Sequence, residues 1–263
     1  MRVGVFDSGL GGLTIVQAIL KVLKGSEIIY VADTLHAPYG EKSTQEILDF
    51  SLTITRYLIE RHQIDALVVA CNTATSAAIE TLRNTFLDLI IIGTEPAIKP
   101  AIEQTNRGNI GVLATPATLK GDKYQSLVDR VASSKEVRLY EQACPGLVEH
   151  IERDSLRSDE SITLLESWLH PMRESDVDII VLGCTHYPLA SEVIREVMGR
   201  EVILIESGEA IANYLLMQLQ KNGHQNRGRV KIDLYYTGEI NAEIVHKILG
   251  KQPNLTYLDL SKG

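Results

Sequence analysis

The chain has 263 residues, of which 44% are hydrophobic and 23% are charged, as in a folded protein with one or two hydrophobic cores. Its formal net charge of −8 argues against a nucleic-acid partner, because such surfaces depend on clustered Lys and Arg. No apolar run reaches the roughly eighteen residues that span a bilayer, so no membrane partner is expected.

The sequence starts with an apolar segment, VGVF at 3–6, and shows no signal-peptide pattern, so we expect a cytoplasmic protein. Its three cysteines are Cys71, Cys144 and Cys184. In the cytoplasm they are expected to be free thiols, since disulfides are rare there. Their spacing contains no CxxC pair, which argues against a zinc or thioredoxin-like site.

Along the chain, short apolar runs alternate with longer segments that have helical spacing, which predicts a parallel sheet covered by helices. The run at 3–6 leads into the glycine-rich stretch DSGLGG and a helix over about 13–24. A second strand is predicted at 27–33, and a helix at about 43–62. The strand ALVVA then ends at Cys71.

The same order returns after about 110 residues, which indicates an internal repeat. NIGVLATPAT at 109–118 resembles VGVFDSGLGG, and EVRLYEQAC at 136–144 resembles EIIYVADT. VDIIVLGCTH resembles IDALVVACNT, with Cys184 in the place of Cys71. Interchangeable α/β strands could produce any single match. Three ordered matches predict two pseudo-symmetric α/β lobes, each a mainly parallel sheet flanked by helices.

The boundary between the lobes is expected near residue 96, after GTEP. A strand and a helix at 202–216 are expected to lead back to the first lobe, and KIDLYY to form a further strand. We therefore assign residues 1–95 plus 208–263 to the first lobe and 96–207 to the second. The active site is expected between them.

Cys71 and Cys184 are candidate acid–base groups, because ligands bind at the carboxyl ends of strands in open parallel sheets. Two weak acids on opposite faces of a carbon atom can remove a proton on one side and deliver one on the other, which inverts a stereocentre. A buried cysteine can also be a packing residue, and we assign that role to Cys144. A helix is expected to begin at each of the other two, which should lower at least one thiol pKa.

DSGLGG at 7–12 allows three interpretations. A phosphate loop is disfavoured, because Thr14 stands where GxGxxG needs glycine and no Walker lysine is present. Asp7 or Ser8 could simply cap the following helix. We favour Asp7 as a site residue that binds a substrate ammonium or steers a thiol proton. His186, two residues beyond Cys184, is expected to orient or protonate that sulfur.

Polar residues near the other strand ends could bind substrate. Tyr39 and Gly40, in PYG, form either an ordinary turn or contacts at the rim of the site. The strand-end motifs contain no Arg or Lys, so a carboxylate would have to bind helix-start N–H groups and hydroxyls. These hydroxyls belong to Ser8, Thr73, Thr115, Thr118 and Thr185.

Five stretches together resemble bacterial glutamate racemases of the aspartate/glutamate racemase family: GVFDSGLGGLT, HAPYGEKS, VVACNTATSAA, EPAIKPA and LGCTHYPL. The resemblance runs from residue 3 to about 216. It implies a cofactor-independent isomerase, without a metal, that interconverts L- and D-glutamate and supplies D-glutamate for peptidoglycan.

By this resemblance, Cys71 serves the D-enantiomer and Cys184 the L-enantiomer, assisted by Asp7 and His186 respectively. Glu152 matches an acidic residue that lines the family's site, although its neighbours Glu149 and His150 are more polar than usual. The implied substrate-binding residues are Ser8, Tyr39, Gly40, Asn72, Thr73, Thr115, Thr118, Glu152 and Thr185.

Several alternatives stay open. Relatives that racemise aspartate or decarboxylate malonates share the fold, and some keep one cysteine; two cysteines favour a racemase. The choice of glutamate over aspartate rests on the resemblance alone. A regulatory binding protein on the same fold is another alternative. The expected partner is the substrate glutamate, and a homodimer is left open.

Overall fold

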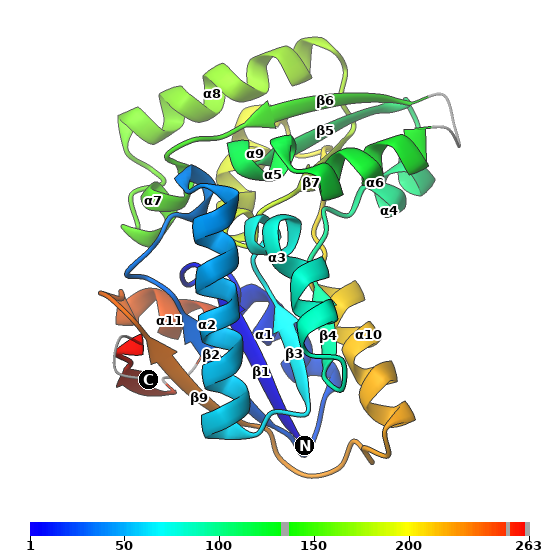
Figure 1. Cartoon of the computed structure of the whole chain (residues 1–263). Helices are drawn as coiled ribbons and strands as arrows, with labels where there is room; N and C mark the ends of the chain where they lie inside the picture. The colour runs from blue at the N-terminus through cyan, green and yellow to red at the C-terminus, as the bar shows by residue number, and fades with distance from the viewer. Residues whose placement is uncertain (133–136, 251–252, 261–263) are drawn as a thin grey trace.

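A computed structural model of the protein describes residues 1–132, 137–250 and 253–260 (Figure 1). It contains two parallel β-sheets, of six and four strands, each flanked by helices. We call the six-stranded sheet with its helices the first lobe and the four-stranded sheet with its helices the second lobe. The predicted α/β class with two sheet-containing lobes is confirmed.

The first sheet has the strand order β10-β9-β2-β1-β3-β4. Its strands are β1 (Arg2–Asp7), β2 (Glu27–Ala32), β3 (Ala66–Val69), β4 (Ile90–Gly93), β9 (Lys231–Tyr236) and β10 (Asn254–Tyr257). Its helices are α1 (Leu13–Val22), the 3-10 helix η1 (Tyr39–Glu41), α2 (Thr44–His62), α3 (Asn72–Thr85), α10 (Gly208–Lys221) and α11 (Ala242–Leu249). The predicted strand KIDLYY is therefore β9, beside β2.

The second sheet has the order β6-β5-β7-β8. Its strands are β5 (Asn109–Ala114), β6 (Arg138–Ala143), β7 (Ile179–Leu182) and β8 (Ile203–Ile205). Its helices are α4 (Ile98–Gln104), α5 (Pro116–Lys120), α6 (Asp122–Ala132), α7 (Leu147–Glu152), α8 (Asp159–Glu174), the 3-10 helix η2 (Tyr187–Ala190) and α9 (Ser191–Met198). None of the described helices combines the length and hydrophobicity that a bilayer-spanning segment needs.

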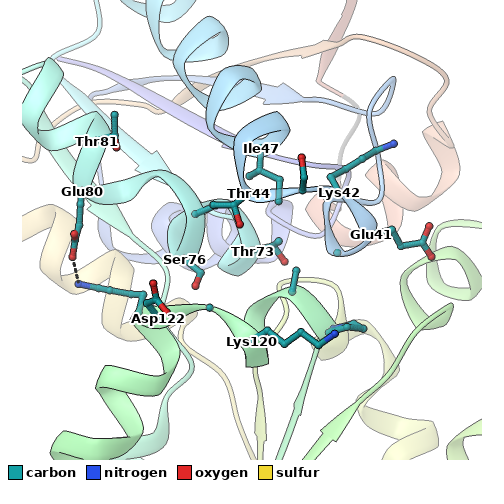
Figure 2. Close-up of a pocket in the computed structure, with 17 residues that line it drawn as sticks. Glu41, Lys42, Thr44, Ile47, Thr73, Ser76, Glu80, Thr81, Lys120 and Asp122 are labelled. Atoms are coloured by element: carbon teal, nitrogen blue, oxygen red, sulfur yellow. Dashed lines mark ion pairs between the residues drawn. The ribbon is translucent and has the colours of Figure 1, made fainter.

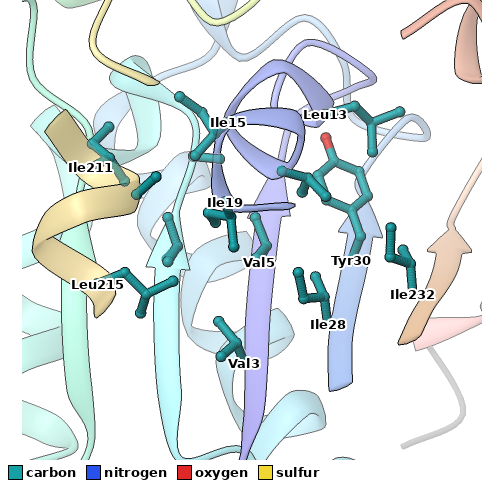
Figure 3. Packing of buried hydrophobic residues seen from close by; sticks show 14 of the residues in the cluster. Val3, Val5, Leu13, Ile15, Ile19, Ile28, Tyr30, Ile211, Leu215 and Ile232 are labelled. Atoms are coloured by element: carbon teal, nitrogen blue, oxygen red, sulfur yellow. The ribbon is translucent and has the colours of Figure 1, made fainter. Parts of the chain in front are cut away.

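The first sheet is buried on both faces, which explains why its central strands are continuous apolar runs rather than alternating ones. Val3 and Val5 of β1 pack into one core, whereas Phe6 packs into the core on the opposite face. Figure 3 shows the first of these cores, where Ile211 and Leu215 of α10 lie beside α1 over the strands. The chain thus returns to the first lobe through α10, as the sequence predicts.

The strand order repeats between the lobes, because β2-β1-β3-β4 corresponds to β6-β5-β7-β8. Val3 pairs with Ile28 and Ala66, and Ile110 pairs with Leu139 and Ile179 in the same way. The first and third sequence matches therefore join equivalent strands.

The second sequence match is displaced by two residues. Glu27 corresponds in register to Arg138 rather than to Glu136, which lies outside the described residues. A shift of two residues leaves every side chain on the same face of a strand, so the apolar pattern alone could not distinguish the two alignments.

Candidate active site

The carboxyl ends of the central strands of both sheets meet at one place. Asp7 ends β1 and Cys71 follows β3, whereas Thr115 and Cys184 follow β5 and β7. Hydrogen bonds join the two edges: the Thr185 hydroxyl donates to Asp7 Oδ1 at 3.2 Å. The Thr73 and Thr115 hydroxyls also lie 2.9 Å apart. The structure thus brings the predicted strand-end residues together between the lobes.

Cys71 is the N-cap residue of α3, and its Sγ accepts a hydrogen bond from the Ala74 N–H at 3.4 Å. The same sulfur lies 3.9 Å from the Ser8 hydroxyl oxygen. Burial raises the pKa of the Cys71 thiol, the Asp7 carboxylate raises it further, and the Ala74 N–H only partly opposes this shift. The expected lowering of the pKa by a helix start is therefore outweighed at Cys71, which is held as a thiol.

Cys184 has different surroundings from those predicted. It begins no α-helix: a turn follows it, then η2 from Tyr187, and α9 starts only at Ser191. The short, proline-containing segment Tyr187–Ala190 makes this tighter connection. Its sulfur lies 3.8 Å from Nδ1 of His186, so the predicted pairing of this thiol with His186 has the required proximity.

Glu152, at the end of α7, holds the other side of the His186 ring. His186 Nε2 lies 2.8 Å from Glu152 Oε1, and the Leu10 N–H donates to the same oxygen at 2.8 Å. Burial alone would lower the pKa of His186, but its hydrogen bonds to Cys184 and Glu152 and the charge of Glu152 raise it. Burial would raise the pKa of Glu152, but His186 and the Leu10 N–H lower it. The pair is thus an imidazolium and a carboxylate.

Nε2 of His186 also lies 3.1 Å from the Gly11 N–H. A ring nitrogen that carries a proton donates it to Glu152, whereas a bare nitrogen accepts from Gly11, so only one of these bonds exists at a time. A Cβ on Gly11 would lie 2.3 Å from His186 Nδ1, which explains why glycine is required there. The DSGLGG loop of the first lobe therefore packs against the Glu152–His186 pair of the second lobe.

Asp7 is fully buried, and its Oδ2 accepts hydrogen bonds from the N–H groups of Gly9 and Gly12, each at 3.1 Å. Together with the Leu10 bond to Glu152 described above, carboxylates occupy three N–H groups of this loop. A phosphate loop needs such groups free, so the phosphate interpretation is wrong. Asp7 both shapes the turn and places a negative charge near Cys71.

Three buried hydroxyls form a cluster across the lobes, which we call the threonine cluster (Thr73, Thr115 and Thr118). Thr73 Oγ1 lies 2.9 Å from Thr115 Oγ1 and 3.1 Å from Thr118 Oγ1, and the Thr115 hydroxyl donates to Thr118 at 2.9 Å. A cavity of about 630 Å³ lies next to it, lined by the start of α2, by α3 and by the α5–α6 connection (Figure 2). Thr73 and Gly40 form part of its wall.

Asn72 and Tyr39 differ in whether their polar side-chain atoms have hydrogen-bond partners. The buried Asn72 Oδ1 has no hydrogen-bond partner within the described residues. The Tyr39 side chain is 1% exposed and packs in the core between the first sheet, α2 and α3. Its hydroxyl donates to Asp33 at 2.5 Å, which holds the phenol inside this core. We therefore assign the predicted ligand contact of Tyr39 to its backbone.

Two contributing residues were not predicted. Asp33 directly follows β2, so the strand-end rule that selected Asp7 could have found it. Tyr30 lies inside β2, and its hydroxyl donates to the Gly9 carbonyl at 2.7 Å; no local sequence signal indicates this.

Cys144 is buried in the core of the second lobe, in agreement with the packing role assigned to it. In the described part of the chain, no group of at least three His, Cys, Asp or Glu residues could hold a metal ion.

Known proteins are similar to this chain in both sequence and fold. The profile of Asp/Glu/hydantoin racemases matches residues 3–215, and the chain belongs to this family. It is 60% identical over 249 residues to a glutamate racemase of Sulfurovum sp., covering 95% of this chain and 94% of that protein.

Solved structures are also similar. A glutamate racemase of Bacillus anthracis has a TM-score of 0.88 at 32% identity, covering 98% of this chain and 97% of that one. The Escherichia coli glutamate racemase in complex with L-glutamate and the activator UDP-MurNAc-Ala has a TM-score of 0.84 at 33% identity, with 98% and 97% covered.

Proposed function

We propose that this protein is a glutamate racemase that interconverts L- and D-glutamate without a cofactor, and that it supplies D-glutamate for peptidoglycan in the cytoplasm. The observation that carries this proposal is the pair of buried thiols, one from each lobe, at equivalent strand ends. The names of the similar proteins and the L-glutamate bound in the Escherichia coli structure support glutamate as the substrate.

In the direction from L to D, Cys184 acts as a thiolate beside the His186 imidazolium, which holds the proton that this thiol has given up, and the thiolate removes the α-proton of L-glutamate. Cys71, protonated because of its burial and the nearby Asp7, delivers its proton to the opposite face of the α-carbon. The product is D-glutamate, Cys184 is then a thiol and Cys71 a thiolate, and exchange with solvent restores the starting state. Glu152 stabilises the imidazolium of His186 while it holds the proton.

The substrate-binding groups follow from their hydrogen-bonding capacity. The unpartnered Asn72 Oδ1 accepts from the substrate ammonium, because a buried acceptor without a partner costs about 1–3 kcal/mol. Ser8 and the threonine cluster supply hydroxyl donors to the two carboxylates, and Thr185 lines the site while its hydroxyl donates to Asp7. Asp7 remains the carboxylate that assists Cys71.

We also retain the division of the chain into residues 1–95 plus 208–263 and residues 96–207 as the two units between which substrate binds. A homodimer is a separate question that sedimentation of the purified protein would answer.

Circular dichroism of L-glutamate incubated with the protein tests the function. The expected result is loss of the optical signal to zero, at equal concentrations of the enantiomers, with L-aspartate turned over far more slowly. An unchanged signal for both amino acids would support a regulatory binding protein, and faster turnover of aspartate would change the substrate assignment.

A further inference from the structure

Asp33 is a fully buried carboxylate that lies outside the proton-transfer groups. It accepts hydrogen bonds from three side chains: Tyr39 Oη at 2.5 Å, Thr237 Oγ1 at 2.7 Å and His36 Nδ1 at 3.0 Å. Its own N–H donates to the Asp7 carbonyl at 2.9 Å, which fixes it beside β1. A buried carboxylate with this many donors gives its neighbours one defined arrangement.

The aromatic residues around Asp33 fix the Tyr39 ring from the other side. The His36 ring stacks on Phe50 of α2, with centroids 3.9 Å apart, and the Tyr39 ring lies 5.7 Å from the same phenylalanine. Because the phenol is directed toward Asp33, the backbone at Tyr39 and Gly40 lies toward the second lobe. A Cβ on Gly40 would lie 3.0 Å from the Thr115 Cβ, so a side chain at this position would crowd the threonine cluster.

The Tyr39 and Gly40 N–H groups have no acceptor among the described residues. Unpartnered donors beside a threonine cluster match a carboxylate ligand, which accepts several hydrogen bonds. Their position depends on how the PYG turn is held.

The segment after β9 completes the arrangement, although it lies about two hundred residues further along the chain. Thr237 Oγ1 accepts from the Leu35 N–H at 3.0 Å while it donates to Asp33. The Gly238 N–H donates to Thr34 Oγ1 at 2.9 Å. The loop after β2 is therefore hydrogen-bonded, through Thr237 and Gly238, to the segment that follows β9.

We propose that Asp33 is a positioning residue. It holds the Tyr39 phenol, and through it the backbone of Tyr39 and Gly40, which the family resemblance already implies as substrate-binding, and Thr237 orients Asp33 for this purpose. This inference rests on the proposed function for the identity of the ligand. Asp33 itself touches neither substrate nor the thiols.

The test compares Asp33→Asn, Tyr39→Phe, Thr237→Val and the double variant Asp33→Asn/Tyr39→Phe. The Tyr39→Phe change keeps the buried ring and deletes only the hydroxyl, so it provides a folded variant if Asp33→Asn is unstable. We expect Asp33→Asn and Tyr39→Phe each to weaken L-glutamate binding and raise KM by about tenfold, with kcat changed less than about threefold. The double variant should lose about as much affinity as the more strongly affected single variant, because both changes remove the same interaction.

Asp178→Asn is the matched control. Asp178 also accepts from a threonine hydroxyl and a backbone N–H, Thr105 Oγ1 at 2.7 Å and Asn106 N at 2.8 Å, but outside the site. It should lower the melting temperature without changing KM.

Affinity for L-glutamate is measured by calorimetry and KM by racemisation, so the two proposals can fail separately. If the wild type binds glutamate but does not racemise it, the proposed function fails, while the affinities still test Asp33. Unchanged affinity and KM in Asp33→Asn and Tyr39→Phe, or losses that multiply in the double variant, would overturn the positioning role.

Discussion

Cys71 and Cys184 occupy equivalent strand ends, yet their surroundings carry opposite charge. Cys71 caps α3, and its burial together with the nearby Asp7 carboxylate raises its pKa and keeps it protonated. Cys184 precedes a tight turn that places the His186 imidazole 3.8 Å from its sulfur. The fold repeat therefore provides two similar positions, and the local sequence gives one thiol a proton to deliver and the other a group that accepts its proton.

This difference predicts that both thiols are essential although they are not interchangeable. Cys71→Ala and Cys184→Ala should each lower kcat/KM in both directions by at least about 10³-fold, because each removes one of two acid–base groups. Circular dichroism at equal protein concentration measures the rates. Cys144→Ala, at a buried thiol of the second lobe core, is the control and should keep near-normal turnover. Comparable activity in either of the first two variants would refute the site assignment.

A second experiment asks whether the two thiols act on opposite faces. In D2O at early conversion, product from L-glutamate should carry almost complete α-deuterium, because the delivering Cys71 has exchanged with solvent, while remaining substrate keeps its hydrogen. The same should hold from D-glutamate with the roles of the thiols exchanged. Mass spectrometry of the separated enantiomers measures this. Substantial α-hydrogen in the product would indicate a single base.

The sequence allowed the repeat and both thiol positions to be predicted, because strand ends in a parallel sheet are set by short apolar runs and the polar residues after them. The sequence also placed His186 beside Cys184 and Asp7 beside Cys71, but it did not allow the protonation of these groups to be predicted. The protonation of His186 depends on Glu152, which meets it only when the lobes pack, and that of Cys71 on burial that outweighs the helix start.

The role of DSGLGG and the orientation of Tyr39 show the same limit. Glycines after a strand fit both a phosphate loop and a surface for another lobe, and only the partners of the loop N–H groups distinguish them. The Tyr39 hydroxyl bonds to Asp33, six residues away, with support from Thr237, which no local pattern indicates.

A third prediction uses His186→Asn and Asp7→Asn to separate the two sides of the site. Since the enantiomers have equal free energy, each variant must lower kcat/KM equally in both directions, by about 10²-fold or more. The primary deuterium isotope effect should differ between the two enantiomers. With His186→Asn, proton transfer at Cys184 becomes slower, so α-deuterated L-glutamate should show the larger effect. With Asp7→Asn, proton transfer at Cys71 becomes slower, so α-deuterated D-glutamate should show the larger effect. Equal isotope effects for the enantiomers in both variants would show that neither residue serves one thiol specifically.

The smallest expected effect concerns the stability that Glu152 and His186 give to the fold. The pKa of Glu152 is lowered in the folded protein, so its contribution is present above its unfolded value of about 4.3 and is lost as pH falls through the folded value. The pKa of His186 is raised, so its contribution is complete below about 6.5 and is lost as pH rises through the folded value. Both contributions are therefore fully present between about pH 4.3 and about pH 6.5, the two unfolded values. Glu152→Gln should therefore lower the free energy of unfolding by about 2 kcal/mol near pH 5.5, and by less in a His186→Asn background, where no imidazolium is present. Urea unfolding of the single and double variants at pH 5.5 measures this, with Glu149→Gln on the same helix as the control, expected to change little. A loss for Glu152→Gln that is as large in the His186→Asn background as in the unmodified protein would show that the two residues do not form an ion pair, and that the charge beside Cys184 has another origin.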